Sequence, residues 1–269
     1  MNERTLGARL RDILGGRTPD ADMAESGPTP LPLAPGQRQR VIAVLGMHRS
    51  GTSSLVGSLE AAGLFLGDVR TGGAWNRKGH RESGVLNLLH EDVLIANGGG
   101  WFMPPATTEW TAAHRKRRDR FIAEHAELAL WGFKDPRTVL VIDGWLEAIG
   151  DLELVGTFRH PAAVARSLQR RHGTDTIEPW LDLWLTYDRA LLELVEARGF
   201  PLVDFDLPND DYQARVRALT AELHLPGPEG DGSFFEASLR TSQRDVPAEL
   251  ELPAEVSEVY ERLRAVAAA

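Results

Sequence analysis

The stretch VIAVLGMHRSGTSSLVGSLEAAG, from Val41 to Gly63, decides the fold of this chain. It begins with an unbroken apolar run, which predicts a buried parallel strand. Gly46 and Gly51 bound the turn that follows, and small polar residues then open a predicted helix over Thr52–Ala62. A strand, a glycine-bounded turn and a helix start together form the layout of a loop that binds phosphate.

The same loop departs from the usual nucleotide-triphosphate pattern, G-x-x-x-x-G-K-[ST]. The residue after Gly51 is Thr52 rather than lysine, and the cation of the loop is Arg49, which comes earlier. A kinase would lack its main contact to the transferred phosphate, so kinase activity is the weaker alternative. We expect an anion to be held by the amides of Ser50 to Ser53 and by the hydroxyls of Thr52 and Ser53. The alternative is a tight connection without a ligand.

Predicted strands alternate with predicted helices along the chain. This alternation indicates an α/β fold, with a P-loop-type parallel central sheet of about four or five strands and helices on both faces. The other predicted strands are Leu130–Phe133, Leu152–Phe158 and Pro201–Phe205. The predicted helices are Glu82–Ala96, Thr111–Leu130, Val139–Ile149, one from Pro161, Ile177–Arg198, Asp210–Leu223 and Val256–Val266.

Two parts of unequal size are expected. Residues 1–39 form an arm or linker, because a short amphipathic pattern over residues 1–15 is followed by a stretch rich in Gly, Pro and small polar residues. Residues 40–269 form one α/β domain, since the chain is long enough and apolar enough for an ample core.

The composition of the chain argues against several classes of function. The chain has no cysteine and a net charge of −9, which excludes thiol chemistry and disfavours a general nucleic-acid binder. No apolar run is long enough to span a bilayer, and the N-terminus does not read as a secretory signal, so a cytoplasmic protein without an integral membrane segment is expected. The histidines lack metal-ligand spacing, so no metal site is expected.

The segment GMHRSGTS resembles the 5′-phosphosulfate loop of sulfotransferases that use 3′-phosphoadenosine 5′-phosphosulfate (PAPS). In that family a cation precedes Ser-Gly, and Arg49 falls on this position. The resemblance covers roughly residues 40 to 245. It implies that His48, Arg49, Ser50, Gly51, Thr52 and Ser53 hold the 5′-phosphosulfate of PAPS.

A second motif of this family is a strand that ends in arginine and is followed by a helix that carries a serine. LELVGTFRHPAAVARSL offers Arg159 and Ser167, and the resemblance implies that they hold the 3′-phosphate. The alternative is an arginine that caps or pairs with the next helix. The C-terminal G-x-x-G-x-x-K of cytosolic members is missing, and Arg240 is the candidate for a contact to the 3′-phosphate or the adenine.

A third mark is WGFKDPRT, in which Lys134 resembles the lysine of K-[ST]-P in carbohydrate-modifying members. The resemblance places Lys134 near the transferred sulfuryl group, where a fixed cation stabilises developing negative charge. The alternative is a turn in which Asp135 pairs with Arg137 while Lys134 snorkels to solvent. A kinase would instead use Asp135 as the partner of its metal.

A fourth mark lies in AWNRKGHRESGVLNLLHEDVL, which resembles the N-x-x-G-[YFH]-x-E segment of bacterial members. It makes Glu82 the candidate catalytic base and His80 a second candidate. The alternative is that Glu82 is a favourable acid in the first turn of a helix. The histidine of the K-T-H motif is absent, because Pro136 occupies its position.

The resulting hypothesis is a sulfotransferase that moves a sulfuryl group from PAPS to a hydroxyl or amine of a carbohydrate or small-metabolite acceptor. Loop residues Trp75, Trp101 and Trp110 are candidates for stacking on that acceptor, or for local packing. A P-loop kinase and a non-catalytic nucleotide-binding member are the alternatives. The sequence leaves the acceptor and the oligomeric state open.

Overall fold

The computed structural model describes residues 27–70, 79–227 and 251–269. The strands of these segments form one parallel sheet in the order β2-β1-β3-β4. Its members are β1 (Arg40–Leu45), β2 (Leu130–Lys134), β3 (Glu153–Phe158) and β4 (Leu202–Asp204). This sheet confirms the predicted α/β fold, with four strands in the described part of the chain.

The helices follow the predicted order with shifted ends. They are α2 (Thr52–Ala61), α3 (Gly84–Ala96), α4 (Ala112–Ala123), η1 (Pro136–Leu140), α5 (Ile142–Ala148), α6 (Pro161–His172), α7 (Glu178–Arg198), α8 (Asn209–Glu222) and α9 (Ala254–Ala268). The helix predicted over residues 139–149 is divided, because the chain leaves β2 through the short 3₁₀ helix η1 and only then enters α5. The helix predicted over residues 256–266 is α9, which is slightly longer at both ends.

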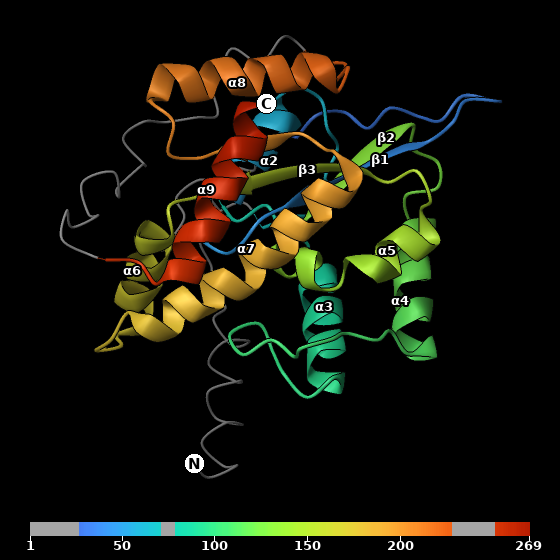
Figure 1. Cartoon of the computed structure of the whole chain (residues 1–269). Coiled ribbons are helices and arrows are strands. Elements are labelled where there is room, and N and C mark those ends of the chain that lie inside the picture. The colour runs from blue at the N-terminus through green and yellow to red at the C-terminus, as the bar shows by residue number, and fades with distance from the viewer. Residues whose placement is uncertain (1–26, 71–78, 228–250) are drawn as a thin grey trace.

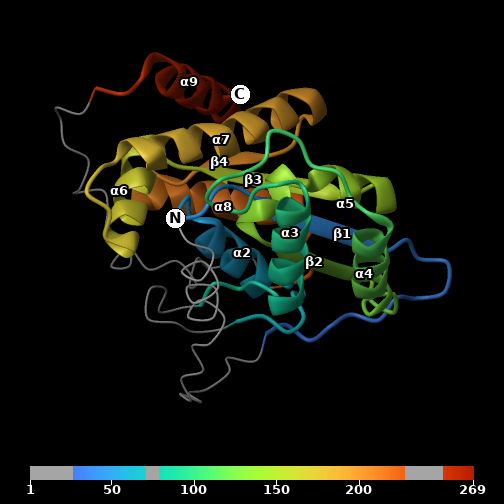
Figure 2. The same cartoon turned by 90° about the horizontal axis from the view of Figure 1, so that it is seen from below.

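Both faces of the sheet are covered, as Figures 1 and 2 show. Side chains alternate between the two faces of a strand. In β1, Val41, Ala43 and Leu45 therefore enter the core formed with α3 to α7 and α9, whereas Ile42 and Val44 enter the core under α2 and α8. Burial on both sides explains why the strand is apolar without interruption.

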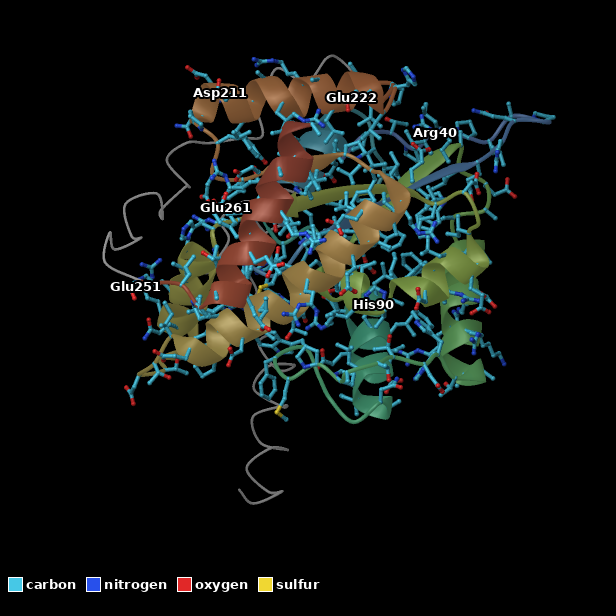
Figure 3. All side chains as sticks on the ribbon, in the orientation of Figure 1. Arg40, His90, Asp211, Glu222, Glu251 and Glu261 are labelled. Atoms are coloured by element: carbon cyan, nitrogen blue, oxygen red, sulfur yellow. The ribbon has the colours of Figure 1, made fainter. Side chains whose placement is uncertain are left out.

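The strand order determines where the site forms. The chain passes from β1 to β2 on one side and later returns to β3 on the other side, so the order reverses at β1. Ligands of open α/β sheets bind at such a point, beyond the carboxyl ends of the strands. The carboxyl ends of these strands lie at the same edge of the sheet. That edge therefore carries Lys134, the loop after β1 and Arg159. Arg40, labelled in Figure 3, pairs with Glu153 at the opposite edge.

The last residues before the sheet run along its β2 side. The amide of Leu33 donates to the carbonyl of Glu127, and the amide of Ala129 donates to the carbonyl of Leu31. The domain boundary at residue 40 stays a prediction. The amphipathic pattern over residues 1–15 lies outside the described residues.

Candidate functional site

The loop after β1 is held in shape by two glycines with positive φ. A Cβ atom at Gly46 (φ +141°) would lie 2.3 Å from the carbonyl oxygen of Thr157, and one at Gly51 (φ +87°) would lie 2.2 Å from the ring of Phe205. No larger residue fits at either place. The loop therefore lies close against β3 and the end of β4, and α2 starts directly after it at Thr52.

Arg49 is the strained residue of this loop. It has a φ of 68°, a left-handed conformation that costs a non-glycine residue roughly 1–2 kcal/mol. Such strain is typical of functional sites. The Nε of Arg49 donates to Ser167 Oγ at 2.9 Å, and the carbonyl of Arg49 accepts from Nη1 of Arg159 at 3.2 Å. The residues expected at the two ends of a nucleotide therefore adjoin.

Positive charge is concentrated around Arg49. Its pKa is lowered to about 10, first by burial and then by the positive charges of Arg171, Arg159 and Arg170. The groups that act most strongly on this cation are therefore other cations, an arrangement that favours a bound anion. Arg170 and Arg171 were missed in the sequence. They could have been recognised because they follow Ser167 by three and four residues on α6, which places them on the same helix face as Ser167.

Arg159 is buried at the end of β3. Its Nε donates to Asp206 Oδ1 at 3.3 Å, and its guanidinium lies 5.2 Å from the centroid of the Phe205 ring. The alternative that Arg159 caps the next helix is wrong. The cap of α6 is His160, whose Nδ1 accepts from the amide of Ala162 at 3.2 Å.

Lys134 and Glu82 form a close ion pair beside the loop. Lys134 Nζ lies 2.6 Å from Glu82 Oε1 and 3.2 Å from Ser53 Oγ. Lys134 is only 2% exposed, so it does not snorkel to solvent. Glu82 lies before the N-cap Ser83 of α3, so it is not an acid of the first helical turn. The Oγ of Ser53 also donates to the carbonyl of His80 at 3.2 Å, which ties the loop to the segment of Glu82.

Two histidines beside the loop are neutral at pH 7. Burial lowers the pKa of His80, although the charge of Glu82 acts in the opposite direction. Burial lowers the pKa of His48 far more, and the charge of Arg137 lowers it further. The Nε2 of His48 is enclosed and has no hydrogen-bond partner among the described residues. Its ring centroid lies 4.8 Å from that of Trp101.

The candidate acceptor tryptophans have different positions. Trp101 is half-buried and lies beside the loop through its contact with His48. Trp110 is a core residue, because its indole nitrogen donates to the carbonyl of Val141 and its ring packs against Trp145. The interpretation of Trp110 as an acceptor residue is therefore wrong. Trp75 and Arg240 lie outside the described residues.

Behind Lys134 lies a polar cluster. It consists of Asn87, His90 and Asp135, with Arg137 and Glu91 at its edge. The pair of Asp135 with Arg137, given as the alternative for the motif WGFKDPRT, forms within it, whereas the other members were not predicted from the sequence. Across residues 27–70, 79–227 and 251–269, no three His, Cys, Asp or Glu side chains gather as metal ligands. In the same segments, no helix combines the length and apolar character needed to cross a membrane.

Comparison with protein-family models gave no match, and comparison with curated protein sequences gave none either. Solved structures do match. The sulfotransferase domain of the olefin synthase from Synechococcus PCC 7002 superposes with a TM-score of 0.52 at 17% identity, over 88% of this chain and 98% of that domain.

Two further solved structures match less well. Sulfotransferase STF1 from Mycobacterium tuberculosis H37Rv has a TM-score of 0.40 at 17% identity, over 84% of this chain and 77% of its own. Sulfotransferase STF9 from Mycobacterium avium has a TM-score of 0.44 at 15% identity, over 87% and 76%. The match to the olefin synthase domain confirms the resemblance seen in the sequence at the level of the fold. The chain has a sulfotransferase fold.

Proposed function

We propose that this protein is a sulfotransferase that moves a sulfuryl group from PAPS to a hydroxyl or amine of a carbohydrate or small-metabolite acceptor. The observation that carries the proposal is Arg49. It is a strained and largely buried cation at the start of α2, and the charges that act on it most strongly are three other arginines. Such a site gains stability when an anion with several negative charges enters it.

The residues around Arg49 fit the donor. Ser50 Oγ is buried and has no partner within the described residues, so a hydroxyl donor remains for a phosphate oxygen. We assign the 5′-phosphosulfate to the loop from His48 to Ser53, and the 3′-phosphate to Arg159 and Ser167. Arg240 stays a predicted contact. When bound, PAPS supplies a sulfuryl group that is activated by its link to phosphate.

The chain's own residues then act on charge and on a proton. Arg49 and Lys134 stabilise the negative charge that develops on the phosphate oxygen as its bond to sulfur breaks. Glu82 takes the proton of the acceptor as the new bond to sulfur forms, and His80 is the second candidate for this step. Lys134 contacts both Ser53 and Glu82, so it connects the donor loop to the base.

The kinase alternative is disfavoured by Asp135, its candidate metal partner. This carboxylate is wholly buried, and its oxygens already accept hydrogen bonds from Asn87, His90 and Arg137. The loop also lacks the lysine that a kinase uses on the transferred phosphate. No observation on the structure favours a non-catalytic member, so that alternative is left to experiment.

Calorimetry with the full chain tests the donor site. We expect it to bind 3′,5′-diphosphoadenosine and to bind ATP with Mg²⁺ much more weakly. Binding of ATP with Mg²⁺ alone would sink the proposal. Transfer of ³⁵S from labelled PAPS to an extract of the protein's own organism then identifies the acceptor, whereas donor binding without any labelled product identifies a non-catalytic member. The cytoplasmic location and the domain over residues 40–269 belong to the same proposal.

A further inference from the structure

One amide side chain lies between two carboxylates at the candidate base. Nδ2 of Asn87, on α3, is 2.9 Å from Asp135 Oδ2 and 3.2 Å from Glu82 Oε2. An amide nitrogen carries two hydrogens, and ionised carboxylates only accept. The amide oxygen would be repelled by both neighbours, so the orientation of the Asn87 side chain is determined.

Asp135 is the fixed end of this arrangement. It is wholly buried, and its Oδ1 accepts from the backbone amide and the Nη1 of Arg137, both at 3.0 Å. The Nε of Arg137 in turn donates to Glu91 Oε2 at 2.6 Å. Burial by itself raises the pKa of Asp135, but the charge of Arg137 and the hydrogen bond from His90 outweigh it, so the carboxyl stays ionised.

His90, labelled in Figure 3, fixes the other oxygen of Asp135. The indole nitrogen of Trp145 donates to His90 Nε2 at 2.9 Å. Because an indole nitrogen can only donate, Nε2 must accept, and the ring proton of a neutral His90 lies on Nδ1. That Nδ1 is 3.1 Å from Asp135 Oδ2 and donates to it. The chain of contacts therefore has one direction, from Trp145 to His90 to Asp135.

We propose that Asn87 is a positioning residue for Glu82, with Asp135 and His90 holding Asn87 in place. The amide holds Glu82 Oε2 while Lys134 holds Oε1, so both oxygens of the candidate base have defined partners. The amide also lies between two carboxylates, and it donates to both of them. The catalytic meaning of this arrangement rests on the proposed function, but the contact itself does not.

The test follows the carboxyl carbon of Glu82 by ¹³C NMR in the full chain labelled at glutamate, with Glu82→Gln to assign the signal. We expect Asn87→Leu to raise the pH at the midpoint of this titration by roughly one unit, because a donor to the ionised form is lost. Asn87→Ala, which also removes the donor and adds no charge, should raise it in the same direction. If the leucine variant does not fold, the smaller alanine variant decides.

The matched control is Asn97→Leu. Asn97 ends the same helix and also uses its Nδ2 twice, to the carbonyls of Val93 at 2.8 Å and Glu109 at 3.0 Å, but it contacts neither carboxylate. A merely structural role predicts lower melting temperatures for both positions and no change in the midpoint. An unmoved midpoint in both Asn87 variants, or an equal shift in the Asn97 variant, overturns the inference.

The same variants separate this inference from the proposed function. Where PAPS turnover is measured, the acidic limb of the kcat profile should move to higher pH with the NMR midpoint, while KM for PAPS stays unchanged. Failure of the wild type to bind 3′,5′-diphosphoadenosine, together with a shifted midpoint, ends the proposed function and leaves the role of Asn87 intact. Binding of that molecule with an unmoved midpoint ends only the inference.

Discussion

The two ends of the candidate site differ in the groups that surround their cations. At the donor end, Arg49 contacts the neutral hydroxyl of Ser167, and the charges that act on it most strongly are other arginines. At the other end, Lys134 faces Glu82 at 2.6 Å, and Arg137 is held by two carboxylates. At the first end Arg49 is acted on mainly by other cations, although Arg159 pairs with Asp206. At the second end Lys134 and Arg137 each face a carboxylate.

This difference indicates what each end is built to do. A compensated and buried ion pair has a fixed geometry, which suits groups that must be aligned before a reaction. Arginines whose charges act on one another are stabilised when an anion enters, which suits binding of a highly charged donor. Substitutions at the two ends should therefore separate turnover from donor binding.

The largest effect is expected from a substitution at the end of the site where Lys134 pairs with Glu82. Glu82→Gln removes the proton acceptor but keeps the shape of the side chain, so turnover should fall by about 10²- to 10⁴-fold. Binding of 3′,5′-diphosphoadenosine, measured by calorimetry, should be nearly unchanged. Glu124→Gln, at the exposed end of α4, is the control. Normal turnover in the Glu82 variant would remove this residue from the mechanism.

The next largest effect is expected at the donor end, where ligand binding should become weaker. Arg159→Ala should cost up to about 3 kcal/mol of binding free energy for 3′,5′-diphosphoadenosine, because a charged contact to phosphate is lost. Calorimetry measures it. Arg38→Ala is the matched control, since Arg38 is an exposed arginine that pairs with Asp151. Equal affinities in the two variants would mean that Arg159 does not contact the bound bisphosphate.

A smaller effect is expected at Arg49, where one substitution should weaken ligand binding without lowering the stability of the fold. Arg49→Gly should weaken binding of the same bisphosphate by about 2 kcal/mol, since a hydrogen-bonded charge is lost. It should also leave the melting temperature unchanged or raise it, because glycine adopts a φ of 68° without strain and the repulsion among the arginines falls. Arg49→Ala separates the two contributions, because alanine keeps the strain. A large loss of stability in the glycine variant would contradict this interpretation of the loop.

The smallest effect concerns His48, on which charges from both ends act. Its pKa is lowered by burial and by Arg137, so the folded protein keeps it neutral where the unfolded chain takes up a proton. Below the ordinary histidine value of about 6.5, the unfolded state binds more protons, and this residue makes the free energy of unfolding fall as the pH falls.

His48→Phe should remove this contribution, so that the slope against pH decreases by up to about 1.4 kcal/mol per pH unit between pH 6.5 and 5. Urea unfolding at several pH values measures it. Burial also raises the pKa of Asp188, which gives a slope of opposite sign, but Asp188 is present in both proteins and cancels in the difference. Identical slopes would show that His48 titrates normally in the folded protein.

Local features of the sequence predicted much of the fold. The apolar run of β1, the glycines of the loop and the small polar start of α2 are neighbours in the chain, so their pattern could be recognised directly. The structure brings Arg49, Ser167 and Arg159 together at one edge of the sheet, and Glu82, Lys134 and Ser53 likewise. The resemblance of these motifs to those of sulfotransferases, together with their order along the sequence, nominated these residues.

The sequence by itself determined the alternation of strands and helices and the residues that carry charge at the strand ends, because these depend on neighbours within a few positions. Only the tertiary structure decided that Arg49 reaches Ser167, that Trp110 belongs to the core, and that Asn87 lies between two carboxylates. The physical reason is that burial and hydrogen-bond partners depend on which strands become neighbours in the sheet. That order brings residues dozens of positions apart into contact, and no local pattern records it.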